Sequence, residues 1–169
     1  MRSKSGIRAI SVLISLIFVI EACGCSLIKN VAGGAKKSEQ EYAEMVFEYI
    51  KNEDIDNLCK LFSPKIRASH DLEKEWEEFF DHMDGKMVSY KSLKYPNEGI
   101  GKDENGEVYK EHYSVNYEGA KTSTGKVYKE IGYYHEVVNK KDPESEGMDV
   151  FTMQDPDTKT WYTVGGETE

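Results

Sequence analysis

The sequence predicts an α+β fold in which three N-terminal helices pack on one face of a curved antiparallel sheet. Apolar residues recur at helical spacing as far as Gly85, and segments rich in valine, tyrosine and threonine follow to the end of the chain. Short connections with turn residues separate these segments. They favour antiparallel neighbours, because parallel pairing needs a long crossover. The 132 residues from Ser38 onward suit a single domain, residues 38–169.

Residues 1–22 have the layout of a signal peptide. Arg2, Lys4 and Arg8 form a basic beginning, and an uncharged, largely apolar segment of 12 residues follows at 9–20. A membrane-spanning helix needs about 20 such residues, so this segment, which Glu21 ends, is too short for a permanent span. We expect it to direct export and then to be removed.

Two cysteines follow this segment, and the residues before them resemble the lipobox of bacterial lipoproteins. Cys23 has an aliphatic residue, Ile20, three positions before it and a small residue, Ala22, directly before it. Cys25 is the alternative lipidation site, with a poorer fit. Glu21 departs from the family pattern under either assignment. An ordinary secretory signal whose cysteines later form a disulfide is the competing interpretation.

Residues 23–37 are predicted to be the lipidated cysteine and a flexible tether, since they contain Gly33 and Gly34 and no amphipathic period. The chain has a net charge of −9, and removal of residues 1–22 leaves 19 basic and 30 acidic side chains, a net charge of −11. Anionic lipids and nucleic acids select basic surfaces, so nucleic acid is not an expected partner. Membrane attachment would depend on acyl chains, on the outer face of the cell membrane.

Three helices are expected within residues 38–85. Ser38 would cap the first helix together with Glu41, and Glu39 would favour the positive end of its dipole. The second helix would cover residues 55–62, because Pro64 prevents its continuation. The third would run from about residue 71 to 84, ended by Gly85.

Aromatic residues of the third predicted helix are expected to form the core. Trp76 and Phe79 should be buried against the concave face of the sheet. Asp81, His82 and Asp84 lie near the end of this helix and fit a solvated surface better than a catalytic site.

Five segments are predicted to be strands, and the connections between them to be turns. The strands are expected at residues 86–93, 107–117, 126–138, 148–153 and 160–165. Turns are expected at residues 96–106, 122–125, 139–147 and 155–159.

The segments "YIKNEDIDNLCKLFSPKI" and "EFFDHMDGKMVSY" resemble the nuclear transport factor 2-like, cystatin-like cone fold. In particular they resemble small Gram-positive lipoproteins of unknown function, over residues 40–165. The resemblance implies a pocket between the concave sheet and the helices. Some relatives use this pocket for isomerase or dehydratase chemistry, and many only for binding.

Alternation along two predicted strands indicates which side chains would line such a pocket. Tyr109, Tyr113 and Tyr117 share one face of the strand at residues 107–117, and His112 lies on the opposite face. Tyr133 and His135 share a face of the next strand, so His135 is the one histidine expected to point inward. No carboxylate shares that face of its strand, which favours binding over acid–base catalysis.

Other signals for chemistry are weak, and we predict no cofactor and no metal site. The four histidines and Cys59 show no metal-ligand spacing, and "DENGE" fits a turn better than a calcium loop. Cys59 is expected to be a small buried residue, although pairing with Cys25 stays open.

Two classes of function therefore remain. The favoured one is an anchored binding or interaction module for a small molecule, glycan or peptide. The other is a small extracytoplasmic enzyme of isomerase, dehydratase or hydrolase type. An inward ionisable pair at the base of a closed cavity would support the enzyme.

Overall fold

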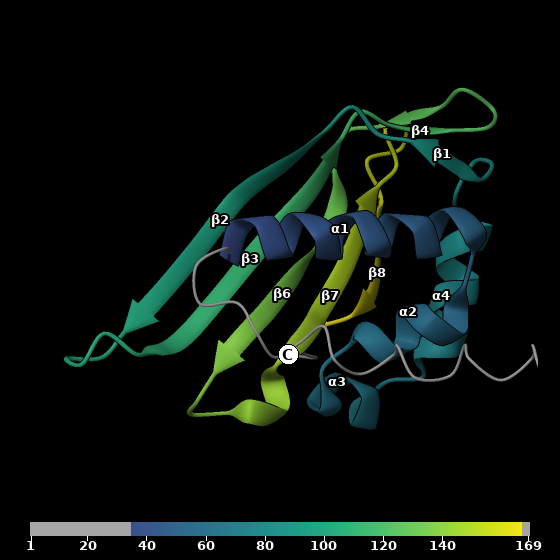
Figure 1. The fold of residues 1–169 in the computed structure, drawn as a ribbon. Helices are drawn as coiled ribbons and strands as arrows, with labels where there is room; N and C mark the ends of the chain where they lie inside the picture. The colour runs from purple at the N-terminus through teal and green to yellow at the C-terminus, as the bar shows by residue number, and fades with distance from the viewer. Residues whose placement is uncertain (1–34, 167–169) are drawn as a thin grey trace, which may run out of the picture. The chain divides into compact units, whose positions relative to one another are not determined.

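Residues 35–166 are described by the structure, a computed structural model, with side chains described from Ser38 onward. They form four helices followed by eight strands in two antiparallel sheets, which confirms the predicted α+β class. Figure 1 shows α1 (Ala35–Asn52) crossing one face of the larger, curved sheet, which is not closed into a barrel. Within the described residues, no helix has the length and apolar character that a membrane span requires.

The first helix begins earlier than predicted. α1 starts at Ala35, so Ser38 lies inside its first turn and is not the N-cap. Alanine and lysine at positions 35–37 have high helix propensity, which accounts for the additional residues. As a result Glu39 lies one turn into the helix, where its side chain is buried.

The prediction of three helices is wrong by one, because a short helix follows Pro64. α2 (Ile55–Leu61) ends before the proline as expected, but α3 (Pro64–Ser69) then begins with Pro64 as its first residue. Proline is well suited to this position, since the first helical N–H has no partner in any case. Ser63 caps the helix by accepting a hydrogen bond from the Ile66 amide. α4 (Leu72–Asp81) corresponds to the predicted third helix, with Asp71 as its N-cap.

The larger sheet has five strands in the order β2-β3-β6-β7-β8, with every neighbouring pair antiparallel. Its strands are β2 (Ser92–Lys102), β3 (Val108–Glu118), β6 (Ile131–Asn139), β7 (Gly147–Gln154) and β8 (Trp161–Gly165). A small second sheet contains β1 (Met87–Ser89), β4 (Ala120–Thr122) and β5 (Val127–Tyr128). Two of the predicted strands are thus each divided between the two sheets, and β4 was not predicted.

The predicted turn at residues 96–106 is wrong for most of its length, because β2 continues to Lys102 and only the tip at 103–107 turns. Pro96 is tolerated because β2 is an edge strand and an irregularity in its pairing falls between Lys94 and Asn97. Further along, the imidazole of His112 covers Gly99, where a Cβ would lie 2.5 Å from His112 Cε1. Glycine at position 99 therefore leaves room for the His112 ring of β3 beside the edge strand.

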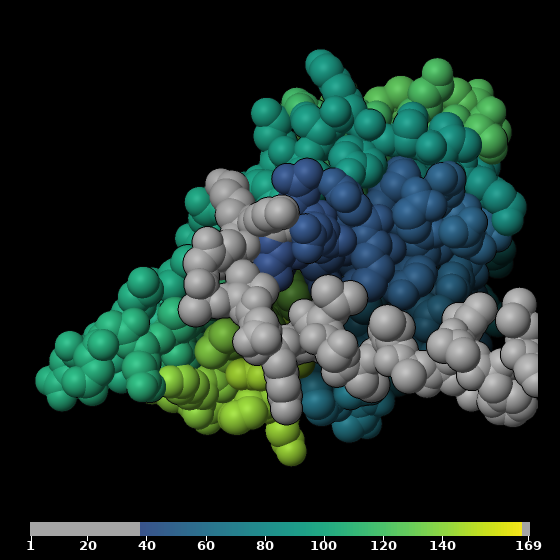
Figure 2. Space-filling view, viewed as in Figure 1, coloured from purple at the N-terminus to yellow at the C-terminus, as the bar shows by residue number. Residues whose placement is uncertain are grey.

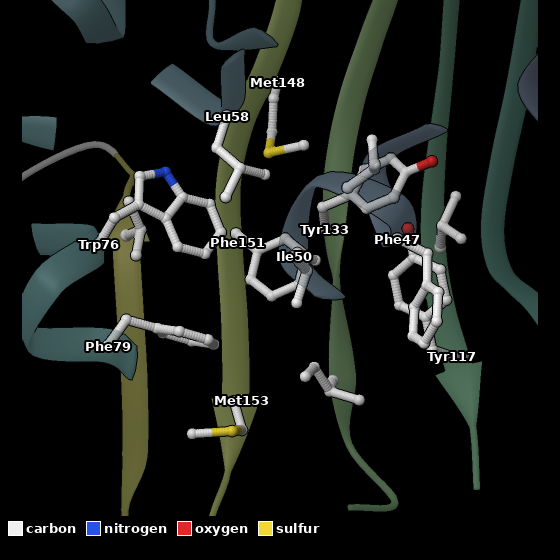
Figure 3. Close-up of a cluster of buried hydrophobic side chains, with 14 of the residues drawn as sticks. Phe47, Ile50, Leu58, Trp76, Phe79, Tyr117, Tyr133, Met148, Phe151 and Met153 are labelled. Atoms are coloured by element: carbon white, nitrogen blue, oxygen red, sulfur yellow. The ribbon is translucent and has the colours of Figure 1, made fainter. Parts of the chain in front are cut away.

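The hydrophobic core lies between the helices and the inner face of the five-stranded sheet, which is the face that α1 crosses. Figure 2 shows the side chains of α1 covering the middle of this side of the domain. Trp76 and Phe79 are buried, as predicted, with exposed fractions of 0% and 2%. In Figure 3 both rings point from α4 toward Phe151 of β7, and their centroids lie 5.2 and 5.5 Å from the Phe151 ring. Packing of this kind fixes α4 on the sheet.

Candidate functional site

A polar group of four buried or partly buried side chains, the inner cluster, joins α1 to β6. Its members are Glu39, Tyr42, Tyr133 and His135. The Tyr133 hydroxyl donates to Glu39 Oε1 at 2.9 Å, and His135 Nδ1 lies 2.9 Å from Glu39 Oε2. The Tyr42 ring stacks on the His135 ring at a centroid distance of 4.1 Å. His135 thus lies on the inner face beside Tyr133, as alternation predicts, and its carboxylate partner comes from a helix.

Glu39 is the acceptor at the centre of the inner cluster, whereas the buried Tyr42 hydroxyl has no hydrogen-bond partner among the described residues. Glu39 is 3% exposed, and each of its oxygens already has a partner within the chain. Burial is the main cause that raises the pKa of Tyr133 and of Tyr42, with Glu39 as a further cause for both. Both phenols therefore stay protonated at neutral pH, and Tyr133 acts as a donor.

The other tyrosines predicted to line a pocket lie at different depths. Tyr117 is fully buried and donates its hydroxyl to the Ala43 carbonyl of α1 at 2.8 Å. Tyr113 is 3% exposed and donates to Glu111 Oε1 at 2.9 Å, whereas Tyr109 is 38% exposed near the start of β3. The Tyr113 and Tyr117 hydroxyls are thus engaged within the chain, Tyr109 is exposed, and ligand binding by these residues stays a prediction.

The opposite, outer face of the five-stranded sheet carries a depression of about 250 Å³, which we call the aromatic hollow. Gly132 of β6 contributes no side chain there, because a Cβ would collide with the Val115 carbonyl of β3. Trp161, at the start of β8, is 53% exposed, the highest value among the large hydrophobic residues of the described chain. The lining of the aromatic hollow includes Pro96, Asn116, Tyr134, Val150, Thr152 and Trp161.

A second depression of about 340 Å³, the acidic hollow, adjoins the first at Tyr134, which lines both. The Tyr134 hydroxyl donates to Glu136 Oε2 at 3.0 Å. Burial, followed by this hydrogen bond, raises the pKa of Tyr134 to about 12. The remaining lining residues are Lys65, Asn139, Asp142, Ser145 and Asp149. The two hollows form neighbouring aromatic and acidic areas on one side of the sheet.

The three remaining histidines lie outside the inner cluster, and the Nδ1 atom of His70 lies 2.9 Å from Glu75 Oε1. His112 lies on the outer face, as predicted, with its ring stacked at 5.6 Å from the Tyr134 ring and its Nδ1 buried without a hydrogen-bond partner. His82 is exposed at the end of α4 and stacks on Tyr162 at 4.1 Å. Across residues 35–166, no group of three His, Cys, Asp or Glu side chains is arranged to hold a metal ion.

The cysteines can be placed only in part. Cys23 and Cys25 lie outside the described residues, so lipidation stays a prediction, as does pairing of Cys25 with Cys59. Cys59 is partly buried in α2, less than predicted. Burial raises the pKa of its thiol to about 11, and Glu73 is the next cause. The thiol is therefore protonated and unreactive at neutral pH.

Sequence reasoning missed three side chains that define these sites: Glu39, Glu136 and Trp161. With a helix start at Ser38, the sequence assigns Glu39 to the positive end of the helix dipole and not to the core. Alternation in "TWYTVG" could have identified Trp161. Val164 is fully buried, and Trp161, three positions before it, must face the opposite side of the strand. Glu136 carries no local signal, because its burial depends on neighbouring strands.

Comparison with known proteins gives a family without an assigned activity. No curated protein sequence matches the chain. A family model described as "Domain of unknown function (DUF5104)" matches residues 45–155. The match includes α2, α3, α4 and the strands from β1 to β7, together with His135 and Glu136, whereas Glu39 and Trp161 fall outside it. Because this match covers well over half of the chain, the protein belongs to the DUF5104 family of domains of unknown function.

Proposed function

We propose that this protein is a lipid-anchored, extracytoplasmic binding module that holds its ligand on the outer face of the five-stranded sheet. The aromatic hollow is the observation that carries the proposal, because it combines an open depression with an indole ring that is 53% exposed. Tryptophan is among the side chains most enriched at the energetic centres of binding interfaces. A ligand that covers Trp161 would remove a large apolar surface from water.

The shape and polarity of the aromatic hollow limit what it can hold. Its volume of about 250 Å³ is near the lower end of small-ligand sites, roughly 300–1,000 Å³. A single sugar ring or one or two peptide side chains would fit. The indole of Trp161 offers a flat apolar surface, and Thr152 offers a hydroxyl group beside it. This combination suits an amphipathic ligand, such as a glycan or a peptide.

The anchor and location are part of the same proposal. Cys23, with Cys25 as the alternative, would carry the lipid after removal of residues 1–22, as in the small Gram-positive lipoproteins that the sequence resembles. The mature chain is acidic, so acyl chains and not surface charge would hold it at the membrane. Because α1 begins at Ala35, the tether would be residues 23–34, shorter than the predicted 23–37, and would reach at most about 43 Å, which leaves the sheet free to meet ligands outside the cell.

The assignment to nuclear transport factor 2-like, cone-shaped domains also belongs to the proposal. A helix that crosses the inner face of a curved, open antiparallel sheet supports it. In this chain the space beneath α1 is filled by side chains such as Phe47, Tyr117 and Tyr133 (Figure 3). This filling favours binding on the outer face.

The test of the proposal uses the mature chain, residues 23–169, on arrays of bacterial glycans and of peptides. For each ligand found, Trp161→Ala should weaken binding at least tenfold without changing the melting temperature. Ile100→Ala is the matched control, because Ile100 is an exposed apolar residue, 51% exposed, that does not line the aromatic hollow. Trp76, the other tryptophan, is fully buried, so a ligand that changes the fluorescence should do so through Trp161. This change should therefore be absent from the Trp161→Phe variant. Ligands whose affinity is unaffected by Trp161→Ala would contradict the proposal.

An extracytoplasmic enzyme is the second candidate, and one observation favours it. Glu39 and His135 form the inward ionisable pair, 2.9 Å apart, that acid–base chemistry would need. The completed hydrogen bonds of Glu39 argue against it, as does the position of both hollows away from this pair. A turnover reaction that His135→Ala slows at least 100-fold with the fold intact would establish the enzyme instead.

A further inference from the structure

Two hydroxyl groups in the aromatic hollow are open to a ligand. Ser114 of β3 and Thr152 of β7 line the hollow from the two strands that flank β6. Neither hydroxyl has a hydrogen-bond partner within residues 38–166, and neither oxygen is among the buried atoms without a partner. Both side chains are only partly buried, so both oxygens are in contact with solvent. A ligand in the hollow can therefore reach them.

Glu130 places a carboxylate at the rim of the same hollow. Its side chain is exposed, and Asn116 Nδ2 donates to its Oε2 at 3.3 Å, which orients the group. The other oxygen, Oε1, has no hydrogen-bond partner in the described part of the chain. No lysine or arginine of the described residues lines the hollow. The local charge is therefore negative and disfavours an anionic ligand.

The position of the hollow over the middle of the sheet disfavours a peptide chain. Gly132 in its lining belongs to β6, which pairs with β3 on one side and with β7 on the other. The backbone groups of β6 are used in these pairs, so an extended peptide cannot join them as it would join an edge strand. Peptide amides that lose water here without a new partner would weaken binding. The hollow thus favours a ligand whose buried side has few groups that must be hydrogen-bonded.

A pyranose ring of the gluco configuration meets these conditions. All of its ring substituents are equatorial, so each flat face of the ring presents C–H groups alone. One face can stack on an indole, whose flat apolar surface buries these groups. The hydroxyl groups then point outward from the edge of the ring, toward side chains at the rim.

We infer that the aromatic hollow binds an uncharged glycan through one pyranose ring of the gluco configuration. Trp161, which is 53% exposed, stacks on a face of the ring. The Ser114 and Thr152 hydroxyls bind hydroxyls at its edge, and Glu130 Oε1 accepts a hydrogen bond from another. This assignment rests on the proposed function and names the class of ligand for the same site.

The configuration of the sugar is tested with two uncharged trisaccharides. ¹H–¹⁵N NMR spectra of the mature chain are recorded during titration with cellotriose, and with β-1,4-mannotriose as the control, whose rings have an axial hydroxyl at C2. Cellotriose should shift the Gly132 and Thr152 amide signals and the Trp161 indole N–H signal saturably. Mannotriose should bind at least fivefold more weakly. Equal affinities, or no saturable shift with cellotriose, would overturn the inference.

A matched pair of variants tests the open hydroxyl. Thr152→Val removes the hydroxyl and keeps the shape of the side chain, and it should weaken binding of cellotriose at least threefold. Thr163→Val makes the same change at the residue that pairs with Thr152 on β8 but does not line the hollow, and it should leave the affinity unchanged. Valine is favoured in strands, so both variants should fold. Wild-type affinity in Thr152→Val would overturn the placement of the ring.

The role of the rim carboxylate is tested with two sugars that differ only at C6. The wild-type chain should bind methyl β-D-glucopyranoside at least threefold more tightly than the anionic methyl β-D-glucuronide. Glu130→Gln should bring this ratio close to one, whereas Glu78→Gln, a change at an exposed residue of α4, should leave it as it is. A ratio that Glu130→Gln does not change would overturn the placement of the ring beside Glu130.

A peptide ligand and a failure of the proposed function give different results. Proline-rich peptides bind aromatic grooves without joining a sheet, so hexaproline is the peptide probe. Tighter binding of hexaproline than of cellotriose, dependent on Trp161, would overturn the glycan assignment and leave the binding module in place. Array ligands that depend on Trp161 and are all peptides or anionic glycans would do the same. Binding of cellotriose that Trp161→Ala leaves intact would contradict the proposed role of the aromatic hollow itself.

Discussion

Replacing Glu39 with alanine removes the one acceptor that Tyr133 and His135 share within the core. Each donor left buried without a partner costs about 1–3 kcal/mol, so two such donors would cost about 2–6 kcal/mol. The His135 side chain is 12% exposed, and water can partly replace its lost partner, which places the expected loss nearer to about 2–4 kcal/mol. Small domains have a free energy of unfolding of about 5–15 kcal/mol, so this is a large fraction of it.

The loss is measured by urea unfolding, followed by circular dichroism and by the fluorescence of the buried Trp76. Glu39→Gln should lose less, because its amide oxygen can still accept a hydrogen bond from one of the two donors. Glu41→Ala is the control, since Glu41 is exposed on the same helix and should change the free energy of unfolding by less than about 0.5 kcal/mol. A Glu39→Ala protein as stable as Glu41→Ala would refute the view that the inner cluster fastens α1 to the sheet.

Three further predictions concern other parts of the chain. Trp76→Ala should lower the free energy of unfolding by about 3–5 kcal/mol, because it empties the space between α4 and β7, and an unchanged urea midpoint would contradict this packing. Lys126 donates a 2.7 Å hydrogen bond to Asp155, which lowers the pKa of that carboxyl. The stabilisation is present above the unfolded pKa, about 3.9, and is lost as the pH falls further, so acid unfolding of Asp155→Asn should depend less on pH below about 4. Cys23→Ala should abolish labelling by a clickable fatty acid in cells and Cys25→Ala should retain it; loss of labelling in Cys25→Ala alone would transfer the lipid to Cys25.

The classes of secondary structure followed from the sequence because local signals determine them. Helical spacing of apolar residues located α1, α2 and α4, and alternation located β3, β6, β7 and β8. The errors arose where a local signal conflicts with strand pairing or has two possible meanings. Pro96 and the glycines after it indicate a turn. The strand β2 nevertheless continues through them, because the residues before and after Pro96 pair with β3. Pro64 indicates the end of one helix and also begins the next.

The sites were harder to predict, because their residues meet only in the folded chain. Glu39 and His135 are 96 positions apart, and nothing near either residue announces the other. Glu136 becomes buried only because β3 and β7 lie on either side of β6. Alternation can assign a side chain to a face of a strand, but the depth of that face depends on the helices and connections that cover it.

The two edge strands of the five-stranded sheet, β2 and β8, determine whether neighbouring copies of the protein can pair through their sheets. Exposed edge strands have unpaired backbone groups that can pair with an edge strand of another molecule and start aggregation. On β2, Pro96 has no N–H to donate, and the pairing irregularity beside it disturbs the regular ladder. On β8, Glu75 accepts the hydrogen bond of the Gly165 amide at 2.7 Å, so this donor is occupied within the molecule. Both edge strands therefore resist pairing with a strand of a second chain. Copies of the protein that are crowded together are expected to stay separate.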